Sequence, residues 1–214
     1  MAALLGPNGA GKSTLFALAC GARRPEAGRV LVDGTTVRPG AVAWMPQSVQ
    51  AMPGLRAREQ AALAGWMQGR RRGAAWRAAG EALDAVGLLD HADVRCHHLS
   101  GGQLRRLGIA EVLAADPSAV LLDEPTVGLD PVQRTEVLEL IGQLGKRCQV
   151  IVATHLVEDL ATAFDSVAVL VGGRLRFSGS VDDFLGAGAG AGDGRGDFAL
   201  RAGSAYRSIV GASG

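Results

Sequence analysis

The stretch GPNGAGKST, residues 6–14, constrains the fold of this chain more than any other. It fits the pattern G-x-x-x-x-G-K-[ST], in which a glycine-rich loop between a strand and a helix surrounds phosphate groups with backbone N–H donors. Lys12 can reach the β- and γ-phosphates of a nucleotide, and the Ser13 hydroxyl can ligate Mg²⁺. We therefore predict a nucleotide site formed by Gly6, Asn8, Gly9, Ala10, Gly11, Lys12, Ser13 and Thr14.

The residues on either side of this loop support that interpretation. Met1–Leu5 is apolar and predicts a short strand leading into the loop. The residues after the loop predict a helix whose inner face consists of Leu15, Phe16, Leu18 and Ala19. Apart from Lys12 and Lys146, all of the 22 lysine and arginine residues are arginines. A chain that otherwise uses arginine thus keeps a compact ammonium where a phosphate needs one.

The composition is that of a globular protein with one domain, or one domain and a subdomain: 214 residues, 48% of them hydrophobic. A net charge of +1 gives no reason to expect nucleic acid as a partner. The sequence has neither a signal peptide nor an apolar run of the ~18 residues that a membrane span requires. We predict a soluble, cytoplasmic chain that acts on a membrane only through a partner. The three cysteines are expected to be free thiols, and no metal is expected at Cys96-His97-His98.

Strand and helix patterns alternate along most of the chain and predict an α/β fold with a mostly parallel sheet. Residues 48–98 are helical in character and predict a helical subdomain that stands apart from the sheet. Trp76, Ala79, Leu83 and Val86 recur there at the spacing of one helix face. Residues 186–196 have glycine at every second position and predict a flexible linker, and residues 197–214 predict a loosely held tail. The other predicted strands are 28–34, 41–45, 119–122, 149–153, 166–171 and 174–178.

Polar residues follow two of the buried strands directly. Asp123 and Glu124 come after the apolar run Ala119–Leu122, and His155 follows the strand over 149–153. Ligands of parallel sheets bind at the carboxyl ends of the strands, so these side chains are candidates for the site. Asp123 is suited to hold Mg²⁺, and Glu124 to polarise an attacking water.

The stretch LSGGQ, residues 99–103, predicts a second anion-binding helix start. Ser100 and Gln103 form a capping box, but capping alone does not require Gly101 and Gly102 in the first turn, where they lower helix propensity. Two glycines suit a helix N-terminus whose backbone an anion must approach. Because the chain already has such a terminus at Lys12, a second one indicates a phosphate held between two molecules.

Taken in order, these motifs resemble those of ABC ATPases. The resemblance covers residues 1–185 and rests on the phosphate loop, Gln47, LSGGQ, LLDEP at 121–125, GLD at 128–130 and His155. It implies a P-loop NTPase fold with the helical subdomain inserted between Gln47 and LSGGQ. The phrase EPTVGLDP, the short helical region and the VLVGGRLRFSG hairpin are most similar to ATPases of ABC-2-type exporters.

The resemblance also implies roles for the matched residues. Glu124 is then the catalytic base, His155 steadies the γ-phosphate and the attacking water, and Gln47 senses the γ-phosphate and Mg²⁺. Ser13, Gln47 and Asp123 serve as the Mg²⁺ ligands. The ATP-binding residues would further include Ser100, Gly101, Gly102, Gln103 and Asp130. The implied partners are ATP, a second ATPase subunit in a head-to-tail dimer and a separate transmembrane permease, which places the chain at the inner face of the cell membrane.

One departure from the family pattern affects the N-terminus. Family members usually carry antiparallel strands and an adenine-stacking aromatic before the phosphate loop, whereas Gly6 is only five residues from the start here. We therefore expect an N-terminally truncated sequence. Two alternatives to a transport ATPase stay open: a soluble ABC protein that acts on DNA or ribosomes, and a truncated remnant with weak activity.

Overall fold

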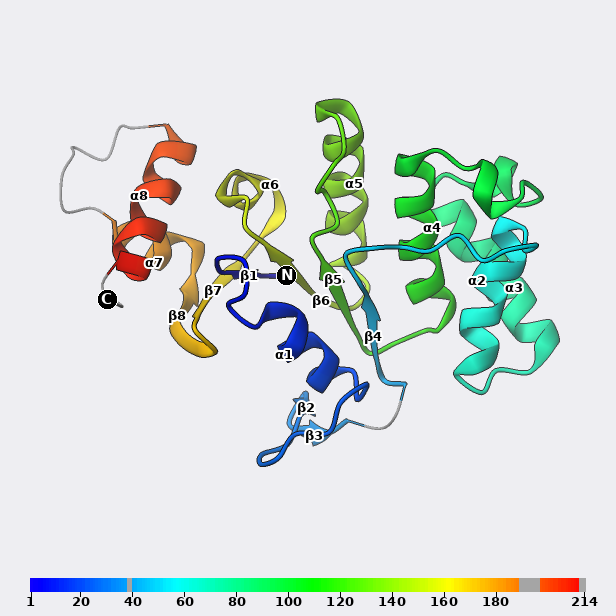
Figure 1. The fold of residues 1–214 in the computed structure, drawn as a ribbon, viewed down its shortest axis with the longest axis horizontal. Helices are drawn as coiled ribbons and strands as arrows, with labels where there is room; N and C mark the ends of the chain where they lie inside the picture. The colour runs from blue at the N-terminus through cyan, green and yellow to red at the C-terminus, as the bar shows by residue number, and fades with distance from the viewer. Residues whose placement is uncertain (38–39, 189–196, 212–214) are drawn as a thin grey trace.

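The computed structural model describes residues 1–37, 40–188 and 197–211. Its centre is a six-stranded sheet in the order β4-β5-β6-β1-β7-β8 (Figure 1). The pairs from β4 to β7 are parallel, and β8 is antiparallel to β7. The expected α/β fold with a mostly parallel sheet is confirmed. The strands are β1 (Ala2–Leu5), β4 (Val42–Met45), β5 (Ala119–Asp123), β6 (Gln149–Thr154), β7 (Ser166–Val171) and β8 (Arg174–Ser180).

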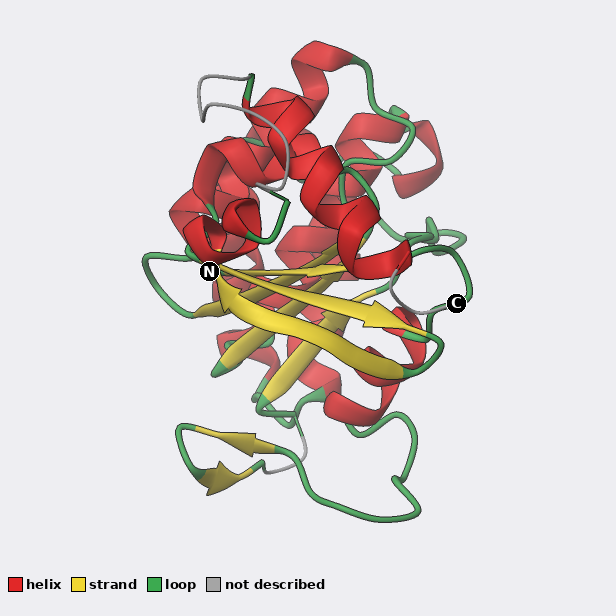
Figure 2. Cartoon of the chain, turned by 90° about the vertical axis from the view of Figure 1, so that its left-hand side faces the viewer, coloured by secondary structure: helices red, strands yellow, loops and turns green. Residues whose placement is uncertain are grey.

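Alternating side chains along the strands pack into two layers, and helices lie above and below the sheet in Figure 2. On β1, Leu4 packs with the layer of α1 (Lys12–Ala19), whereas Leu5 packs with the layer of α4 (Gly101–Ala114) and α5 (Pro131–Leu144). All five residues of β5 are buried, as its unbroken apolar run predicts. β1, the strand that leads into the phosphate loop, lies inside the sheet, between β6 and β7.

The inner face of α1 differs from the prediction at Leu15. Phe16 and Ala17 are buried, Leu18 and Ala19 are half-buried, and Leu15 is 43% exposed. Successive residues of an α-helix point about 100° apart. The buried face is centred between Phe16 and Ala17, so Leu15, which precedes both, points about 150° away from that centre and toward solvent.

The helical subdomain consists of α2 (Ala57–Met67), α3 (Arg72–Ala85) and the short 3₁₀ turns η1 (Leu89–His91) and η2 (Cys96–His98). Figure 1 shows α2 and α3 to the right of the sheet, with α4 between. Of the predicted α3 face, Ala79, Leu83 and Val86 are buried, but Trp76 is 43% exposed. The helix face predicted from spacing is thus correct except at Trp76.

A small hairpin replaces the single strand that we predicted over 28–34. β2 (Leu31–Val32) and β3 (Thr35–Thr36) pair antiparallel around Asp33 and Gly34. Both turn residues have positive φ, 51° and 74°, as a two-residue hairpin turn with the twist of its strands requires. The tight turn reverses the chain before a longer strand can form.

The C-terminal part contains α6 (Leu160–Ala163), preceded by the 3₁₀ turn η3 (Val157–Asp159), then α7 (Val181–Gly186) and α8 (Phe198–Gly211). The tail was expected to be loosely held, but α8 buries Ala202 and Ala205 completely. Its small side chains allow close packing: a Cβ on Gly188 would lie 2.5 Å from the Ala205 backbone nitrogen. Most of the predicted linker, residues 189–196, lies outside the described residues. Within the described ranges, each helix is too short or too polar to cross a membrane.

Candidate functional site

The phosphate loop joins the end of β1 to the start of α1, and its glycines are required by geometry. Gly9 and Gly11 have φ of +79° and +102°, conformations that side-chain-bearing residues rarely adopt. A Cβ on Gly6 would lie 2.4 Å from the Leu170 carbonyl oxygen on neighbouring β7. The three glycines therefore let the loop turn tightly beside the sheet and expose its backbone, while Asn8, Ser13 and Thr14 lie on the exposed side.

Lys12 is almost buried, with 7% of its surface exposed. Its ammonium donates to the carbonyl oxygens of Gly6, at 2.6 Å, and Pro7, at 3.3 Å. It also lies 3.7 Å from Oε1 of Glu124. These contacts hold the positive charge at the mouth of the loop, next to the carboxyl end of β5.

Two carboxylates lie at that end of β5, where only 2% of Asp123 and 5% of Glu124 is exposed. Glu124 has a positive φ of 49°, and its N–H donates to the Ala153 carbonyl of β6 at 2.8 Å. Nδ1 of His155 lies 3.0 and 2.9 Å from the two carboxylate oxygens of Glu124. Because β5 and β6 are parallel neighbours, two residues distant in sequence meet at one edge of the sheet.

Asp123 and Ser13 fit a Mg²⁺ site. Burial raises the pKa of Asp123, and a hydrogen bond between its side chain and Ser13 acts in the opposite direction. Gln47 follows β4, the other neighbour of β5, and is exposed at the same edge of the sheet. Hydroxyl, carboxylate and amide oxygens are the hard ligands that Mg²⁺ takes.

The LSGGQ helix start has the predicted capping box. Ser100 Oγ accepts from the Gln103 backbone N–H at 3.2 Å, and Gln103 Oε1 accepts from the Ser100 N–H at 2.9 Å. The Gln103 amide nitrogen also lies 2.9 Å from Nε2 of His91. Both polar atoms of the Gln103 side chain are thus engaged within the chain, whereas nothing packs over the Cα of Gly101 and Ser100 is exposed.

The structure does not bring LSGGQ to the phosphate loop of the same chain. In Figure 1 the start of α4 lies far from the start of α1, with α5 and part of the sheet between them. Asp130, the last predicted binding residue, caps α5: its Oδ1 accepts from the N–H groups of Val132 and Gln133, both at 3.0 Å. Residues 6–14, 123, 124 and 155 form one cluster, with Gln47 after the neighbouring strand β4, and Ser100 and its neighbours form another.

Comparison with known proteins decides the family. The model of the family described as "ABC transporter" matches residues 1–127, more than half of the chain. The chain belongs to the ABC transporter family. Membership makes it an ATP-binding subunit of ABC type and implies ATPase activity, and it confirms the P-loop NTPase fold predicted from the motifs.

The relatives of this ABC ATPase have different names. It is 36% identical over 193 residues to the energy-coupling factor transporter ATP-binding protein EcfA of Methanocaldococcus jannaschii, covering 84% of this chain and 68% of the relative. It is 33% identical to the linearmycin resistance ATP-binding protein LnrL of Bacillus subtilis, covering 84% and 60%. Among solved structures, cbiO1 from Clostridium perfringens, part of the ABC transporter complex cbiONQ, matches 86% of this chain and 78% of its own at a TM-score of 0.75 and 28% identity.

Arg105, on α4 of this ABC ATPase, makes contacts that the sequence did not predict. From the second turn of α4, its guanidinium donates to the Gln47 carbonyl and, at 3.2 Å, to the Val127 carbonyl. Burial lowers the pKa of Arg105. Its place two residues after LSGGQ is the one feature of the sequence that could have drawn attention to Arg105. The pattern of the helix does not reveal which side Arg105 faces.

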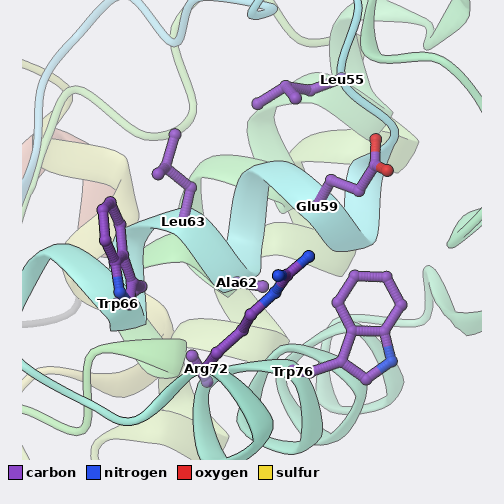
Figure 3. Close-up of a pocket in the computed structure, with 8 residues that line it drawn as sticks. Leu55, Glu59, Ala62, Leu63, Trp66, Arg72 and Trp76 are labelled. Carbon is purple, nitrogen blue, oxygen red and sulfur yellow. The ribbon is translucent and has the colours of Figure 1, made fainter.

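A hollow of about 460 Å³ lies on the helical subdomain and is separate from these clusters (Figure 3). Trp66 and Trp76 project from α2 and α3 on either side of it, with Ala62 and Arg72 between them, Leu63 beside Trp66, and Leu55 and Glu59 at one end. Trp66 is 58% exposed. The lining contains none of the predicted nucleotide-site residues, so this hollow is a different surface of the ATPase.

Proposed function

We propose that this chain binds ATP with Mg²⁺ and hydrolyses it to energise transport through a separate membrane protein. The observation that carries the proposal is the buried group of Lys12, Asp123 and Glu124 beneath the phosphate loop, with His155 against Glu124. Buried charges are costly unless they are paired or hydrogen-bonded. Lys12 is complementary to the phosphates of a nucleoside triphosphate, and the two carboxylates to its cation, beside a glycine-rich helix start.

Each residue has a distinct role in this proposal. The loop N–H groups and Lys12 bind the phosphates, and Glu124 accepts the proton of the attacking water. His155 holds the Glu124 carboxylate in place through the contacts at 2.9 and 3.0 Å. Ser13, Asp123 and Gln47 would hold Mg²⁺, which supplies positive charge that offsets the phosphate oxygens.

The distance between the two clusters supports a second subunit as partner. Ser100 and Gly101 present an open helix start that lies far from the phosphate loop of their own chain, whereas Gly102 behind them is buried and a Cβ there would lie 3.0 Å from the Gln133 side chain. In a head-to-tail pair, each chain would supply this start to the triphosphate held by the other. Gln103 would then contribute through the capping box, and Asp130 through the start of α5.

The transport partner is proposed to be a separate permease at the inner face of the cell membrane. The name of the EcfA relative, a transporter ATP-binding protein, supports a partner of this kind. The hollow between Trp66 and Trp76 offers an aromatic surface for part of that contact. We propose export as the direction, supported by the resemblance of EPTVGLDP to ABC-2-type exporter ATPases and by the resistance protein LnrL among the relatives.

Replacement of the proposed base tests hydrolysis directly. Glu124→Gln keeps the size of the side chain and the phosphate contacts, so ATP binding should persist while turnover falls about a hundred- to ten-thousand-fold. Glu158→Gln, at an exposed position three residues after His155, makes the same change of charge and should leave turnover unchanged. Phosphate release and nucleotide binding are measured on the three proteins. Normal turnover by Glu124→Gln would remove Glu124 from the mechanism.

A further inference from the structure

We propose that Asp159 is a positioning residue for ATP hydrolysis, which holds the segments carrying Glu124, Asp130 and His155 in their relative places. This inference rests on the proposed function. Asp159 ends the short turn η3, and only 1% of its surface is exposed. A carboxylate removed so completely from water needs partners that compensate its charge.

Those partners come from three different segments. Oδ1 accepts from Nε and Nη2 of Arg134 at 2.9 and 2.5 Å. Oδ2 accepts from the hydroxyl of Thr126 at 3.1 Å and from the hydroxyl of Thr154 at 3.5 Å. Two hydrogen bonds from one guanidinium fix orientation as well as distance, because both donors lie in one plane.

Each partner lies next to a residue of the proposed mechanism. Thr126 is two residues after Glu124, and Thr154 directly precedes His155. Arg134 is in the first turn of α5, where its N–H donates to the Asp130 carbonyl at 2.9 Å. One buried carboxylate thus joins the ends of β5 and β6 to the start of α5.

The network can affect the rate without contacting the nucleotide. Glu124 and His155 meet only because the ends of β5 and β6 are held at the right distance, and Thr126 and Thr154 share a single acceptor oxygen just behind them. A displacement of 1 Å in a catalytic group is sufficient to cost on the order of a hundredfold in rate. Phosphate binding depends on the loop and Lys12, which do not contact Asp159 through any of these four hydrogen bonds.

The test separates turnover from binding. In Asp159→Asn, which keeps the shape and removes the charge, kcat should fall by roughly ten- to a hundredfold, and the Kd for ATP should stay within about twofold. Asp84→Asn, an exposed aspartate on α3, is the matched control and should change neither quantity. Arg134→Gln and the double variant complete a cycle, in which the two losses should not add, because both changes break the same contact. Thermal unfolding of each variant checks that it is folded at the assay temperature.

Two smaller changes keep the inference testable if Asp159→Asn does not fold. Thr154→Val removes a single hydroxyl, and Arg134→Lys keeps the charge but loses the planar pair of donors. A fall in kcat with unchanged Kd in these variants supports the positioning role. Unchanged kcat in folded variants, or equal losses of binding and turnover, overturns it and leaves ATP hydrolysis intact. Absence of turnover in the wild-type chain overturns the proposed function itself, and the positioning role with it.

Discussion

The carboxyl group of Glu111 makes the stability of this protein depend on pH, and Glu111→Gln should remove that dependence. Glu111 lies on α4, where Oε1 accepts from Nε2 of Gln60 at 2.5 Å. Gln60 is itself buried: it also donates to the Gln50 carbonyl at 2.9 Å and accepts from the Met52 N–H at 2.8 Å. Burial raises the pKa of Glu111 to about 7, against the opposing effect of the hydrogen bond from Gln60.

The sign and size follow from the two pKa values. The folded state binds the Glu111 proton more tightly than the unfolded state, in which the pKa is near the ordinary 4.5. This contribution to stability is fully present below about pH 4.5 and is lost as the pH rises to about 7. Each pKa unit corresponds to about 1.4 kcal/mol, so the loss amounts to roughly 3 kcal/mol, much of which has accrued by about pH 6.

The assay is urea unfolding of the wild type and Glu111→Gln between pH 4.5 and 8. Cys96, whose pKa the Glu111 charge also affects, titrates near pH 11, outside this range, so the difference in unfolding free energy between the two proteins isolates Glu111. As the pH rises, the unfolding free energy of the variant should increase relative to that of the wild type, by up to roughly 3 kcal/mol. Glu139→Gln, at an exposed position on α5, should show a constant difference. A constant difference for Glu111→Gln as well would refute the reasoning.

Two further predictions concern assembly and thiol chemistry. In a Glu124→Gln background, ATP should produce a dimer in light scattering, and the further change Ser100→Arg should abolish it without unfolding the chain; monomers at all ATP concentrations would contradict the two-subunit site. Burial, with a smaller effect of the Glu111 charge, raises the pKa of Cys96 to about 11. At pH 8 Cys96 should therefore react with a maleimide far more slowly than half-buried Cys20, and equal rates, measured by mass spectrometry of the digested protein, would contradict its burial.

Much of the candidate site could be predicted from the sequence because its residues follow strands. The phosphate loop, Asp123, Glu124 and His155 each come at the end of an apolar run, and parallel strands deliver such residues to one edge. This pattern does not specify the order of the strands in the sheet, so the contact between His155 and Glu124 could be found only from the structure.

Other features depend on neighbours that a linear pattern does not specify. Asp159 is four residues after His155 on a short turn, and its hydrogen-bond partners lie on α5, just after β5 and at the end of β6. Leu15 and Trp76 fit a helical repeat but face solvent. In each helix an adjacent residue, Phe16 or Ala75, is buried instead. The packing of α8 rests on small residues, which carry little hydrophobic signal.

The position of β1 inside the sheet has a consequence for how the chain folds during synthesis. Ala2 pairs with Ile151 on one side and with Ser166 on the other, so β1 lacks both neighbours until β6 and β7 have also been synthesised. The entropy of closing such a long loop must be overcome before these pairs form, and contacts of this range slow folding. β1 is thus among the last elements to reach its place, and a chain released before β7 would carry the complete phosphate-binding motif without one of the two strands that flank it.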